Sequence, residues 1–506
     1  LPHGQIRDND DEQGDVPKKQ KYPYGVGFII GNEFCERFSY FGARTILIIY
    51  FTKILKYPDD SAIDYYHIFT MACYMTTIIG AIIADTLWGK FKTILYLSIL
   101  YAIGNIVLSL GAYVEKEYLC LMARISVYRV WYGWHKTMVI INLKTVAAFG
   151  GDQFGPGMEK QLEKYFSLFY AAINAGGFLS TIVTPILRED VKCFDRDSCF
   201  PLAFGVPAIL MVVALVLFIA GRFICNYNMI PPKKDSVIVQ TSLYRKLFTR
   251  RPKRDHWIDY ADDKFDAQTI TDIKGLMRVC FLFIPLPIFW ALYNQQGSVW
   301  TLQAIKMNGN LFGSYTIKPD QIQVINPVLI IVFIPIFEYV IYPLCAKMNL
   351  LKKPLQRMVC GGVLAAISYV ICGFIQIWVE TKPDGTVNIL WQLIPYIVIT
   401  AAEIMFSITG LEFSYQQAPK SMKSVIQAVY TTTVAFGDII VIIISSAKLF
   451  EKESNTFFFF GGLMVADMIA FAIMAYYYVP YKQPSPINNS DSDVDDSDNS
   501  KDFKKN

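Results

Sequence analysis

Four ionisable side chains lie within a stretch that is otherwise apolar enough to cross a membrane. The stretch GNEFCERFSYFGARTILIIYF, residues 31–51, contains Glu33, Glu36, Arg37 and Arg44. A charged side chain at the bilayer centre costs roughly 2.5 to 3.5 kcal/mol on insertion scales, so such residues face a protein interior or a water-filled cavity and mark transport or proton transfer. The alternative interpretation is a charge cluster that only holds helices together.

Helical spacing brings these charges together. At 100° per residue, Glu33, Arg37 and Arg44 project from one face of a helix, and Glu36 and Tyr40 project from the same face. Because Glu33 precedes Arg37 by four residues, the two can neutralise each other in the empty state. Protonation of a glutamate would release its arginine to hold a substrate carboxylate. The pattern therefore predicts proton binding that is linked to anion binding.

The composition of the chain indicates a polytopic membrane protein. Hydrophobic residues make up 53% of the 506 residues and the mean hydropathy is +0.33, which exceeds what soluble chains of this length show. About 20 apolar residues are needed for one helical crossing. Their non-alternating pattern favours helices over a β-barrel. We expect twelve spans, near 25–54, 62–87, 93–114, 118–143, 165–187, 201–225, 273–294, 320–346, 355–379, 388–410, 422–449 and 456–480.

Lysine and arginine collect at one end of the expected helices. They precede the first span, follow the second, separate the eighth from the ninth and fill the connection RKLFTRRPKRDHW at 245–257. Cytoplasmic loops carry such an excess, so this end and both termini are expected in the cytoplasm. The expected domains are a cytoplasmic tail at 1–21, an N-terminal six-helix bundle at 22–225, a cytoplasmic linker at 226–272, a C-terminal six-helix bundle at 273–480 and an acidic cytoplasmic tail at 481–506.

Several other classes of protein do not fit this sequence. The net charge of +4 comes mostly from the loops that set orientation, and it indicates no nucleic-acid-binding face. The ten cysteines include no CxxC pair, and no serine, cysteine or metal constellation in the apolar spans indicates an enzyme. Cys193 and Cys199 lie in an expected outward loop where oxidation is permitted. The sequence leaves open whether these two form a disulfide.

Two groups of six membrane helices are typical of transporters whose halves rock about a central site. The stretch at 31–51 resembles the ExxERFxYY signature of the proton-coupled oligopeptide transporter family, within the major facilitator superfamily. Further resemblances lie in GAIIADTLWGKFKTILYLS at 80–98, AAFGGDQF at 147–154, FYAAINAGGF at 169–178, PLAFGVPA at 201–208, IPLPIFWALYNQQGSVWTLQA at 284–304 and TGLEFSYQQAPKSMKSV at 409–425. The last two are especially similar to the animal intestinal and renal peptide transporters. The resemblance implies an all-α fold of about twelve transmembrane helices in two six-helix bundles.

The resemblance also implies a function and a site. It implies a symporter that imports di- and tripeptides by alternating access, with protons as the coupling ion and no cofactor. A peptide presents an ammonium, a carboxylate and amides, so its site must offer the complementary groups. The implied proton-coupling residues are Glu33, Glu36, Arg37 and His67. The implied substrate contacts are Arg44 for the carboxylate, Glu403 for the ammonium, Asn174 and Asn326 for the backbone, and Tyr40, Tyr74 and Trp290 for the side chains.

Some positions match or depart from the family pattern in ways that bear on mechanism. Arg278 and Glu338 match an arginine and an acid that pair across helices seven and eight, which implies an outward gate. Phe41 replaces the signature's second tyrosine, so one hydroxyl is absent. Asn294 stands where animal members usually have an acid that pairs with the helix-two histidine, so His67 is expected to lack a charged partner.

Two further departures concern whole segments. Lys144 falls one residue after the family lysine, and one residue turns a helix by about 100°. The connection ETKPDGTVNILW at 380–391 is short, so the large outer domain that many animal members carry between helices nine and ten is expected to be missing.

Two alternative functions stay open at this stage. The same fold could move another small solute, or it could be a transport-inactive peptide sensor. Glu403 together with Arg44 fits a zwitterion better than a simple anion. The expected partners are di- and tripeptides, protons and the lipid bilayer, with no nucleic acid, and the sequence indicates no partner protein. The expected location is the plasma membrane.

Overall fold

The computed structural model describes residues 22–113, 146–155, 158–194, 196–229, 231, 259, 267–311, 315–417 and 423–479. The fourth expected span, at 118–143, and Lys144 lie outside these ranges.

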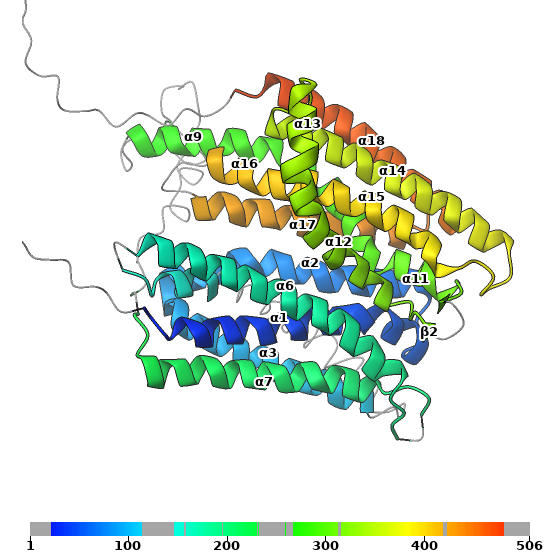
Figure 1. The fold of residues 1–506 in the computed structure, drawn as a ribbon, viewed down its shortest axis with the longest axis horizontal. Coiled ribbons are helices and arrows are strands. Elements are labelled where there is room, and N and C mark those ends of the chain that lie inside the picture. Colours follow the sequence, from blue (N-terminus) through cyan, green and yellow to red (C-terminus); the bar gives the residue numbers. More distant parts are fainter. Residues whose placement is uncertain are drawn as a thin grey trace, which may run out of the picture.

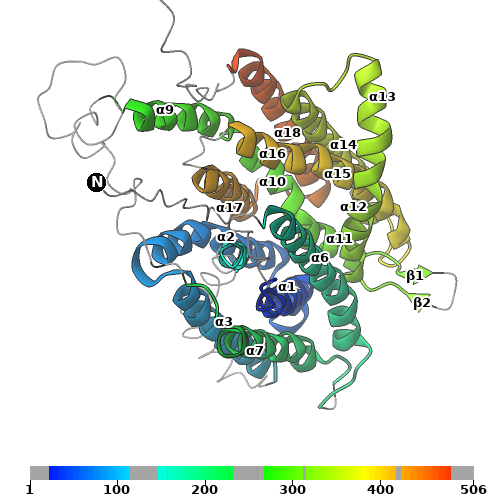
Figure 2. The same cartoon turned by 60° about the vertical axis from the view of Figure 1, so that its left-hand side comes forward.

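Within the described ranges, five long helices form what we call the N-terminal group. They are α1 (Val26–Ile49), α2 (Asp59–Ile83), α3 (Lys90–Tyr113), α6 (Glu159–Glu189) and α7 (Phe200–Cys225). Single π-helical turns extend two of them, η1 (Tyr50–Ile54) after α1 and η2 (Ala84–Trp88) after α2. Helix α1 packs mainly between α6 and α7, with α2 and α3 on the other side of the group (Figure 2).

The remaining elements form the C-terminal group. Its helices are α9 (Ala267–Leu282), α10 (Leu286–Asn294), α11 (Val299–Ile305), α12 (Ile325–Ile336), α13 (Tyr342–Lys347), α14 (Pro354–Thr381), α15 (Leu393–Glu403), α16 (Thr409–Gln417), α17 (Lys423–Ala447) and α18 (Glu453–Tyr477). Shorter turns are η5 (Gln295–Gly297), η6 (Gln321–Val324), η7 (Phe337–Ile341), η8 (Ile389–Gln392) and η9 (Ile404–Ile408). The strands β1 (Asn310–Leu311) and β2 (Tyr315–Thr316) form an antiparallel hairpin in which Asn310 faces Thr316.

The helices run between two ends of the molecule, which we name for what lies there. Helix α1 begins and α18 finishes at the tail end, and the β1–β2 hairpin marks the opposite, hairpin end (Figure 1). The N-terminal group occupies the lower half of this view and the C-terminal group the upper half, with α2 and α17 adjacent at the boundary. Groups in α2 can therefore bond to groups in α17 across the interface.

The helices are long and apolar enough to cross a bilayer. Within the described ranges, eight segments meet this test, and α9 with α10 and α11 adds a ninth if this pair, bent by 49°, is one span. The bend falls beside Pro285 and Pro287, which cannot donate backbone hydrogen bonds. Every expected span except 118–143 falls on a helix or a chain of short helices. The predicted all-α polytopic fold is confirmed.

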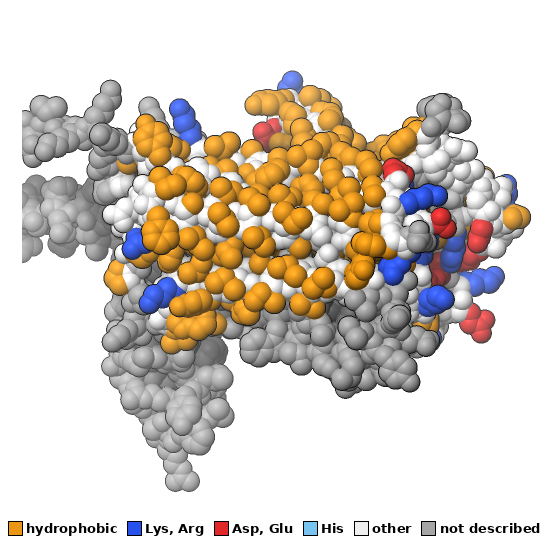
Figure 3. All heavy atoms as spheres, turned by 90° about the horizontal axis from the view of Figure 1, so that it is seen from below, with side chains coloured by type: hydrophobic (Ala, Val, Ile, Leu, Met, Phe, Trp, Pro, Cys, Tyr) orange, Lys and Arg blue, Asp and Glu red, His pale blue; other side chains and the backbone are white. Residues whose placement is uncertain are grey.

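The surface agrees with a membrane environment. Apolar side chains cover the middle of the molecule, and most charged side chains on this face lie toward its ends (Figure 3). Phe223 is 82% exposed and Phe374 63%. Apolar surface this extensive has no counterpart on soluble monomers. It is the surface that lipid covers.

Each group has an apolar core that holds one site-bearing helix. In the C-terminal group, Phe289 of α10 stacks on Phe406 with ring centres 3.9 Å apart. In the N-terminal group, α1 contributes Ile46 to a core that includes Phe204 of α7. Helix α1 carries five of the predicted site residues and α10 carries Trp290, and these cores fix both helices in position.

Two glycines allow the closest helix crossings near the site. A Cβ on Gly176 of α6 would lie 2.7 Å from the backbone oxygen of Phe34 in α1. A Cβ on Gly437 of α17 would lie 2.7 Å from the backbone oxygen of Pro287 in α10. Backbone atoms cannot move aside, so only glycine permits these contacts, as is common between membrane helices.

Candidate functional site

Glu33, Glu36 and Arg37 form a buried ion cluster on α1. Neither glutamate is exposed to solvent, and Arg37 is 3% exposed. The Arg37 Nε atom lies 2.9 Å from Glu33 Oε1, and Arg37 Nη2 donates a hydrogen bond to Glu36 Oε1. The expected contact between residues four apart is therefore present. One guanidinium faces two carboxylates, and a proton on either glutamate would balance the charges of the three residues.

Arg44 lies two turns further along α1 and has no carboxylate partner among the described residues. Its Nε atom donates a hydrogen bond to the Tyr66 hydroxyl at 2.8 Å, and its guanidinium carbon lies 5.8 Å from the centre of that ring. Tyr40 and Tyr74 also interact with it electrostatically. Neutral phenols hold this cation in place without cancelling its charge, so it can bind an anionic group.

Glu403 ends α15 and has no cationic partner within the part of the chain that the structure describes. Its Oε1 accepts a hydrogen bond from the Tyr293 hydroxyl at 2.8 Å, and its Oε2 accepts one from Asn326 Nδ2 at 2.8 Å. The same Asn326 nitrogen donates to Thr400 Oγ1 at 3.1 Å. These donors are neutral, so they orient the carboxylate and leave its charge available to a substrate cation.

A cavity of about 530 Å³ reaches Glu403. Its wall combines residues of α12, η7 and η9 in the C-terminal group with Tyr170 of α6 in the N-terminal group. Tyr293 interacts electrostatically with both Glu403 and Arg44. Among the described residues neither Arg44 nor Glu403 has an oppositely charged partner, and one of them comes from each group.

The other predicted substrate residues occupy varied positions around these charges. Trp290 is 8% exposed and packs edge-on against Tyr293, with 5.8 Å between ring centres. Tyr40 is 2% exposed and stacks on Phe69 at 6.1 Å. Asn174 is half-buried and donates a hydrogen bond from Nδ2 to the Tyr170 carbonyl at 2.8 Å. The asparagine thus bonds within its own helix in this state.

His67 of α2 has a charged partner. Its Nδ1 atom lies 2.8 Å from Asp438 Oδ1 in α17, and its Nε2 atom lies 2.8 Å from Ser298 Oγ. Asn294 Nδ2 donates to the same Asp438 oxygen at 3.0 Å. All four residues are buried. The expectation that His67 lacks a charged partner was wrong, because it considered only position 294 and the acid comes from another helix.

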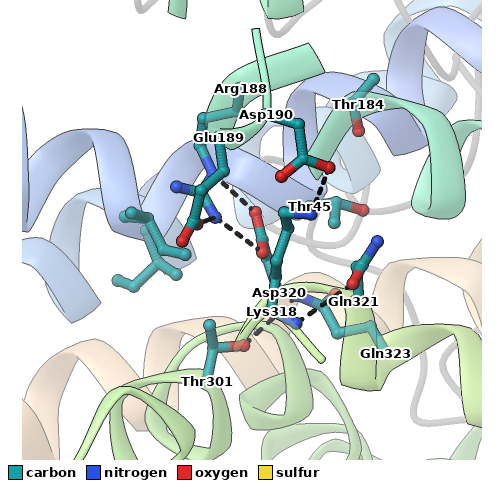
Figure 4. Close-up of polar contacts among 12 residues, drawn as sticks. Thr45, Thr184, Arg188, Glu189, Asp190, Thr301, Lys318, Asp320, Gln321 and Gln323 are labelled. Atoms are coloured by element: carbon teal, nitrogen blue, oxygen red, sulfur yellow. Dashed lines mark hydrogen bonds and ion pairs between the residues drawn. The ribbon is translucent and has the colours of Figure 1, made fainter. Parts of the chain in front are cut away.

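The hairpin end is closed by ion pairs between the two groups. Arg188 of α6 donates to both carboxylate oxygens of Asp320, from Nε at 2.9 Å and from Nη2 at 3.0 Å. Lys318 Nζ donates to Asp190 Oδ2 at 2.7 Å. Figure 4 shows both pairs spanning the gap between the end of α6 and the segment before α12. A two-pronged arginine–carboxylate pair is the strong geometry for such a contact.

Sequence reasoning missed Arg188, Asp320 and Asp438. The first two lie where helices meet loops, and charges there are normally solvated, so nothing local distinguishes them. Asp438 had a usable signal, because it is a lone acid inside the apolar span 422–449, and such residues are functional candidates by default.

The structure does not bring Arg278 and Glu338 together. Both side chains are exposed, and no ion pair joins them within the described ranges. Glu338 instead lines the cavity that reaches Glu403. In this structure the contacts that close one end belong to Arg188 and Asp320, and a gate formed by Arg278 and Glu338 stays a prediction.

Cys193 and Cys199 form a disulfide in the loop between α6 and α7, with 2.07 Å between the sulfur atoms. This answers the question that the sequence left open.

A polytopic helical protein whose two groups are joined by ion pairs at one end, and in which two half-buried charges, Arg44 and Glu403, have no opposite charge among the described residues, has the architecture of a secondary transporter. A family model identifies the kind of transporter. The chain belongs to the POT family (PTR2), whose model matches residues 91–458. The resemblance inferred from its motifs is confirmed.

Relatives and solved structures agree with this assignment. Human solute carrier family 15 member 2 is 32% identical, over 91% of this chain and 90% of that protein. The fruit fly peptide transporter family 1 is 44% identical, over 71% of this chain and 48% of that protein. The crystal structure of an auto-inhibited POT family peptide transporter superposes with a TM-score of 0.80 at 25% identity, covering 92% of this chain and 99% of the other. That of the POT family transporter PepTSo gives 0.79 at 26% identity, covering 90% and 98%.

These comparisons define the class of protein. The chain is a membrane transporter of this family and not an enzyme. The alignment with the human relative runs over 673 positions, more than the 506 residues of this chain, so that relative contains a segment with no counterpart here. Only residues 382–388 connect α14 to η8, so no domain is inserted at that point.

Proposed function

We propose that this protein is a proton-coupled symporter that imports di- and tripeptides, and molecules resembling them, by alternating access of its two groups of helices. One observation carries the proposal. Arg44 of the N-terminal group and Glu403 of the C-terminal group both lack an opposite charge among the described residues, and Tyr293 interacts with both. A short peptide is a zwitterion that supplies both missing charges.

Binding of a zwitterion would draw the two groups together. The peptide carboxylate pairs with Arg44 and its ammonium with Glu403, so the ligand bridges the groups that must move as one. Asn326, which bonds to Glu403, is proposed to contact the adjacent peptide amide. The walls of the proposed site are Tyr40, Tyr74 and Trp290. Asn174 reaches the peptide backbone in a state where its side chain no longer bonds to the Tyr170 carbonyl of its own helix.

The proposed proton-coupling residues are Glu33, Glu36 and Arg37 of α1 and His67 of α2. Glu33 and Glu36 share Arg37, so binding or loss of one proton changes which carboxylate holds the guanidinium. The protons act as the coupling ion, and no cofactor takes part. Because the charge balance of this buried cluster differs between the protonated and deprotonated forms, each form favours a different arrangement of the groups.

The proposed orientation places the tail end in the cytoplasm. Lys90 after η2 and Lys347, Lys352 and Lys353 between α13 and α14 lie at that end, in agreement with the positive-inside rule. The hairpin end then faces outward, with the proposed domains at 22–225 and 273–480 joined by a cytoplasmic linker. The proposed location is the plasma membrane, where an inward proton gradient can drive uptake.

Uptake of a labelled dipeptide into proteoliposomes tests the function. With an inward proton gradient, we expect the internal concentration to rise above the external one. Without a gradient, we expect uptake to stop at equal concentrations. Equal final levels in both conditions would indicate a facilitator, and binding without any uptake would indicate a sensor.

Reversing the charge of Asp320 tests whether the Arg188–Asp320 pair closes the outward-facing end. Asp320→Arg should leave two buried cations facing each other, at a cost of about 3 to 5 kcal/mol to the closed state. We expect a cysteine introduced at Gln323, beside this pair, to react faster with an impermeant maleimide. The double variant Arg188→Asp with Asp320→Arg should restore part of the protection.

The matched control is Lys192→Ala, which removes an exposed loop cation whose ion pair with Asp197 is solvated. This variant should leave unchanged the rate at which the cysteine introduced in place of Gln323 reacts with the maleimide. A rate that Asp320→Arg does not alter would show that the Arg188–Asp320 pair plays no part in closing this end.

A further inference from the structure

Asp438 lies where three helices meet. It follows Gly437, whose missing Cβ allows α17 to press against the backbone of α10, and α17 also packs along α2. Asp438 has no solvent exposure. A carboxylate without access to water depends on neighbouring donors and cations for its stability. The identity of those neighbours therefore indicates what this residue does.

The neighbours of Asp438 fit a protonated histidine. His67 Nδ1 faces Asp438 Oδ1 at 2.8 Å, and His67 Nε2 faces Ser298 Oγ at 2.8 Å. Both ring nitrogens thus point at oxygen atoms that can accept hydrogen bonds, which suits an imidazolium that donates from both. Asn294 Nδ2 donates to the same oxygen of Asp438 at 3.0 Å and contributes no charge.

The second oxygen of Asp438 is unused. Its Oδ2 atom is buried and makes no hydrogen bond with any described residue. The other ionisable groups facing this carboxylate are Tyr66 and Tyr74 of α2, and Arg44 lies behind them, bonded to the Tyr66 hydroxyl. Within the described ranges, His67 is the group in direct contact with Asp438 that becomes a cation when it binds a proton. A neutral His67 would leave the buried Asp438 carboxylate without a cation in direct contact among the described residues.

The contact lies at the base of a polar seam between α2 and α17. Toward the hairpin end, Lys448 Nζ lies 3.0 Å from Asp60 Oδ2, and Ser446 Oγ donates to Asp64 Oδ2 at 2.8 Å. These contacts are exposed or at the rim, where water competes for them. The buried pair of His67 and Asp438 is the member of the seam that water does not screen.

We propose that Asp438 is the proton-coupling carboxylate of His67 in this chain. Position 294 in α10 is a neutral asparagine, so the acid that faces His67 comes from α17, and the histidine ties α2 to α17. Proton uptake by His67 from the hairpin side forms the imidazolium–carboxylate pair and closes that end. Release of that proton to water leaves a neutral imidazole, weakens the tie and permits opening. This proposal rests on the proposed function.

An exchange of the two side chains tests this assignment. Asp438→Asn should reduce gradient-driven dipeptide accumulation about tenfold or more, because the charged partner of His67 is lost, while gradient-independent exchange of labelled peptide persists. The double variant Asp438→Asn with Asn294→Asp should restore accumulation, since the two side chains lie 3.0 Å apart and both can face the histidine. A residue that only packs helices would not be rescued by this exchange.

The pH profile of uptake gives an independent measurement. Asn294→Asp alone adds a second negative charge beside His67, which favours its protonated form, so the pH midpoint of uptake should move up by about one unit or more. Asp438→Asn should move it down. Asp467→Asn is the matched control, because Asp467 of α18 is also largely buried with an unbonded Oδ2 and has no contact with His67. It should leave accumulation and the pH midpoint unchanged.

The outcomes are distinguishable. Full accumulation and an unchanged pH midpoint in Asp438→Asn would overturn the role of Asp438. If Asp438→Asn fails to reach the membrane, the double variant and the pH midpoint of Asn294→Asp test the role of Asp438 instead. A double variant that does not recover accumulation, together with an unchanged pH midpoint in Asn294→Asp, would also overturn that role. Failure of the unmodified protein to accumulate dipeptide in a gradient would instead count against the proposed function.

Discussion

Glu403→Ala is expected to lower the affinity for a free dipeptide by about 2 to 5 kcal/mol, the usual cost of removing one partner of a buried charge pair. The structure explains why the effect should be specific. Glu403 is held by Tyr293 and Asn326, which are neutral, so the ligand ammonium would be its main opposite charge. An N-acetylated dipeptide lacks that ammonium. It should bind the unmodified protein poorly and lose little more in the variant, because the contact removed is one it never made.

The opposite end of the ligand provides the matching measurement. Arg44→Ala should penalise free dipeptides strongly and C-terminally amidated ones little. Competition binding with free, N-acetylated and amidated forms of one dipeptide separates these effects in both variants. The control is Glu412→Gln, which changes a carboxylate on the wall of the same cavity that already bonds to Gln416. It should affect all three ligands little.

Equal losses for free and blocked ligands, at normal surface expression, would show that neither Glu403 nor Arg44 recognises a peptide terminus. Both would then be residues that pack helices. Expression must be measured first, because removal of one charge from a buried cluster can prevent folding.

Glu36→Gln is expected to abolish gradient-driven accumulation while peptide exchange across the membrane continues. Glutamine keeps a hydrogen-bond acceptor for Arg37 but cannot gain or lose a proton, so protonation at this position no longer biases the two states. Arg37 would then be shared between Glu33 and a permanently neutral group. The measurement is dipeptide uptake with and without an inward proton gradient, alongside counterflow exchange with a preloaded peptide.

Counterflow serves as an internal control in this experiment, because a misfolded variant would lose exchange as well as accumulation. Asp467→Asn, another change to a mostly buried acid, should retain both. Undiminished uphill uptake by Glu36→Gln would remove Glu36 from the coupling role and leave Glu33 and His67 as the candidates.

Much of the fold could be predicted because its causes are local. A run of about 20 apolar residues prefers the bilayer, and lipid offers its backbone no partners, so each run must be a helix wherever it sits in the chain. The contact of Glu33 with Arg37 followed from helical periodicity alone, since four residues make about one turn. The bend after α9 could also be anticipated, because Pro285 and Pro287 remove backbone donors there.

The partners of the site residues could not be predicted in this way. His67 and Asp438 are separated by 371 positions, and Arg188 and Asp320 by 132. Asn294 suggested that His67 has no acidic partner. The partner is Asp438 of α17, and no local sequence pattern links α17 to α10. That neither Arg44 nor Glu403 has an oppositely charged partner among the described residues likewise became visible only from the packing of the helices.

The sequence by itself therefore determined that this protein is a bundle of membrane helices, that charges share one face of α1, and that its motifs are those of a peptide transporter family. The tertiary structure decided which charges are paired and which have no opposite charge among the described residues. The physical reason is that hydrophobic transfer and helical periodicity act over a few turns of one chain segment. Charge pairing inside a membrane depends on which helices pack together, and at the α10–α17 crossing that packing depends on a single missing Cβ, at Gly437.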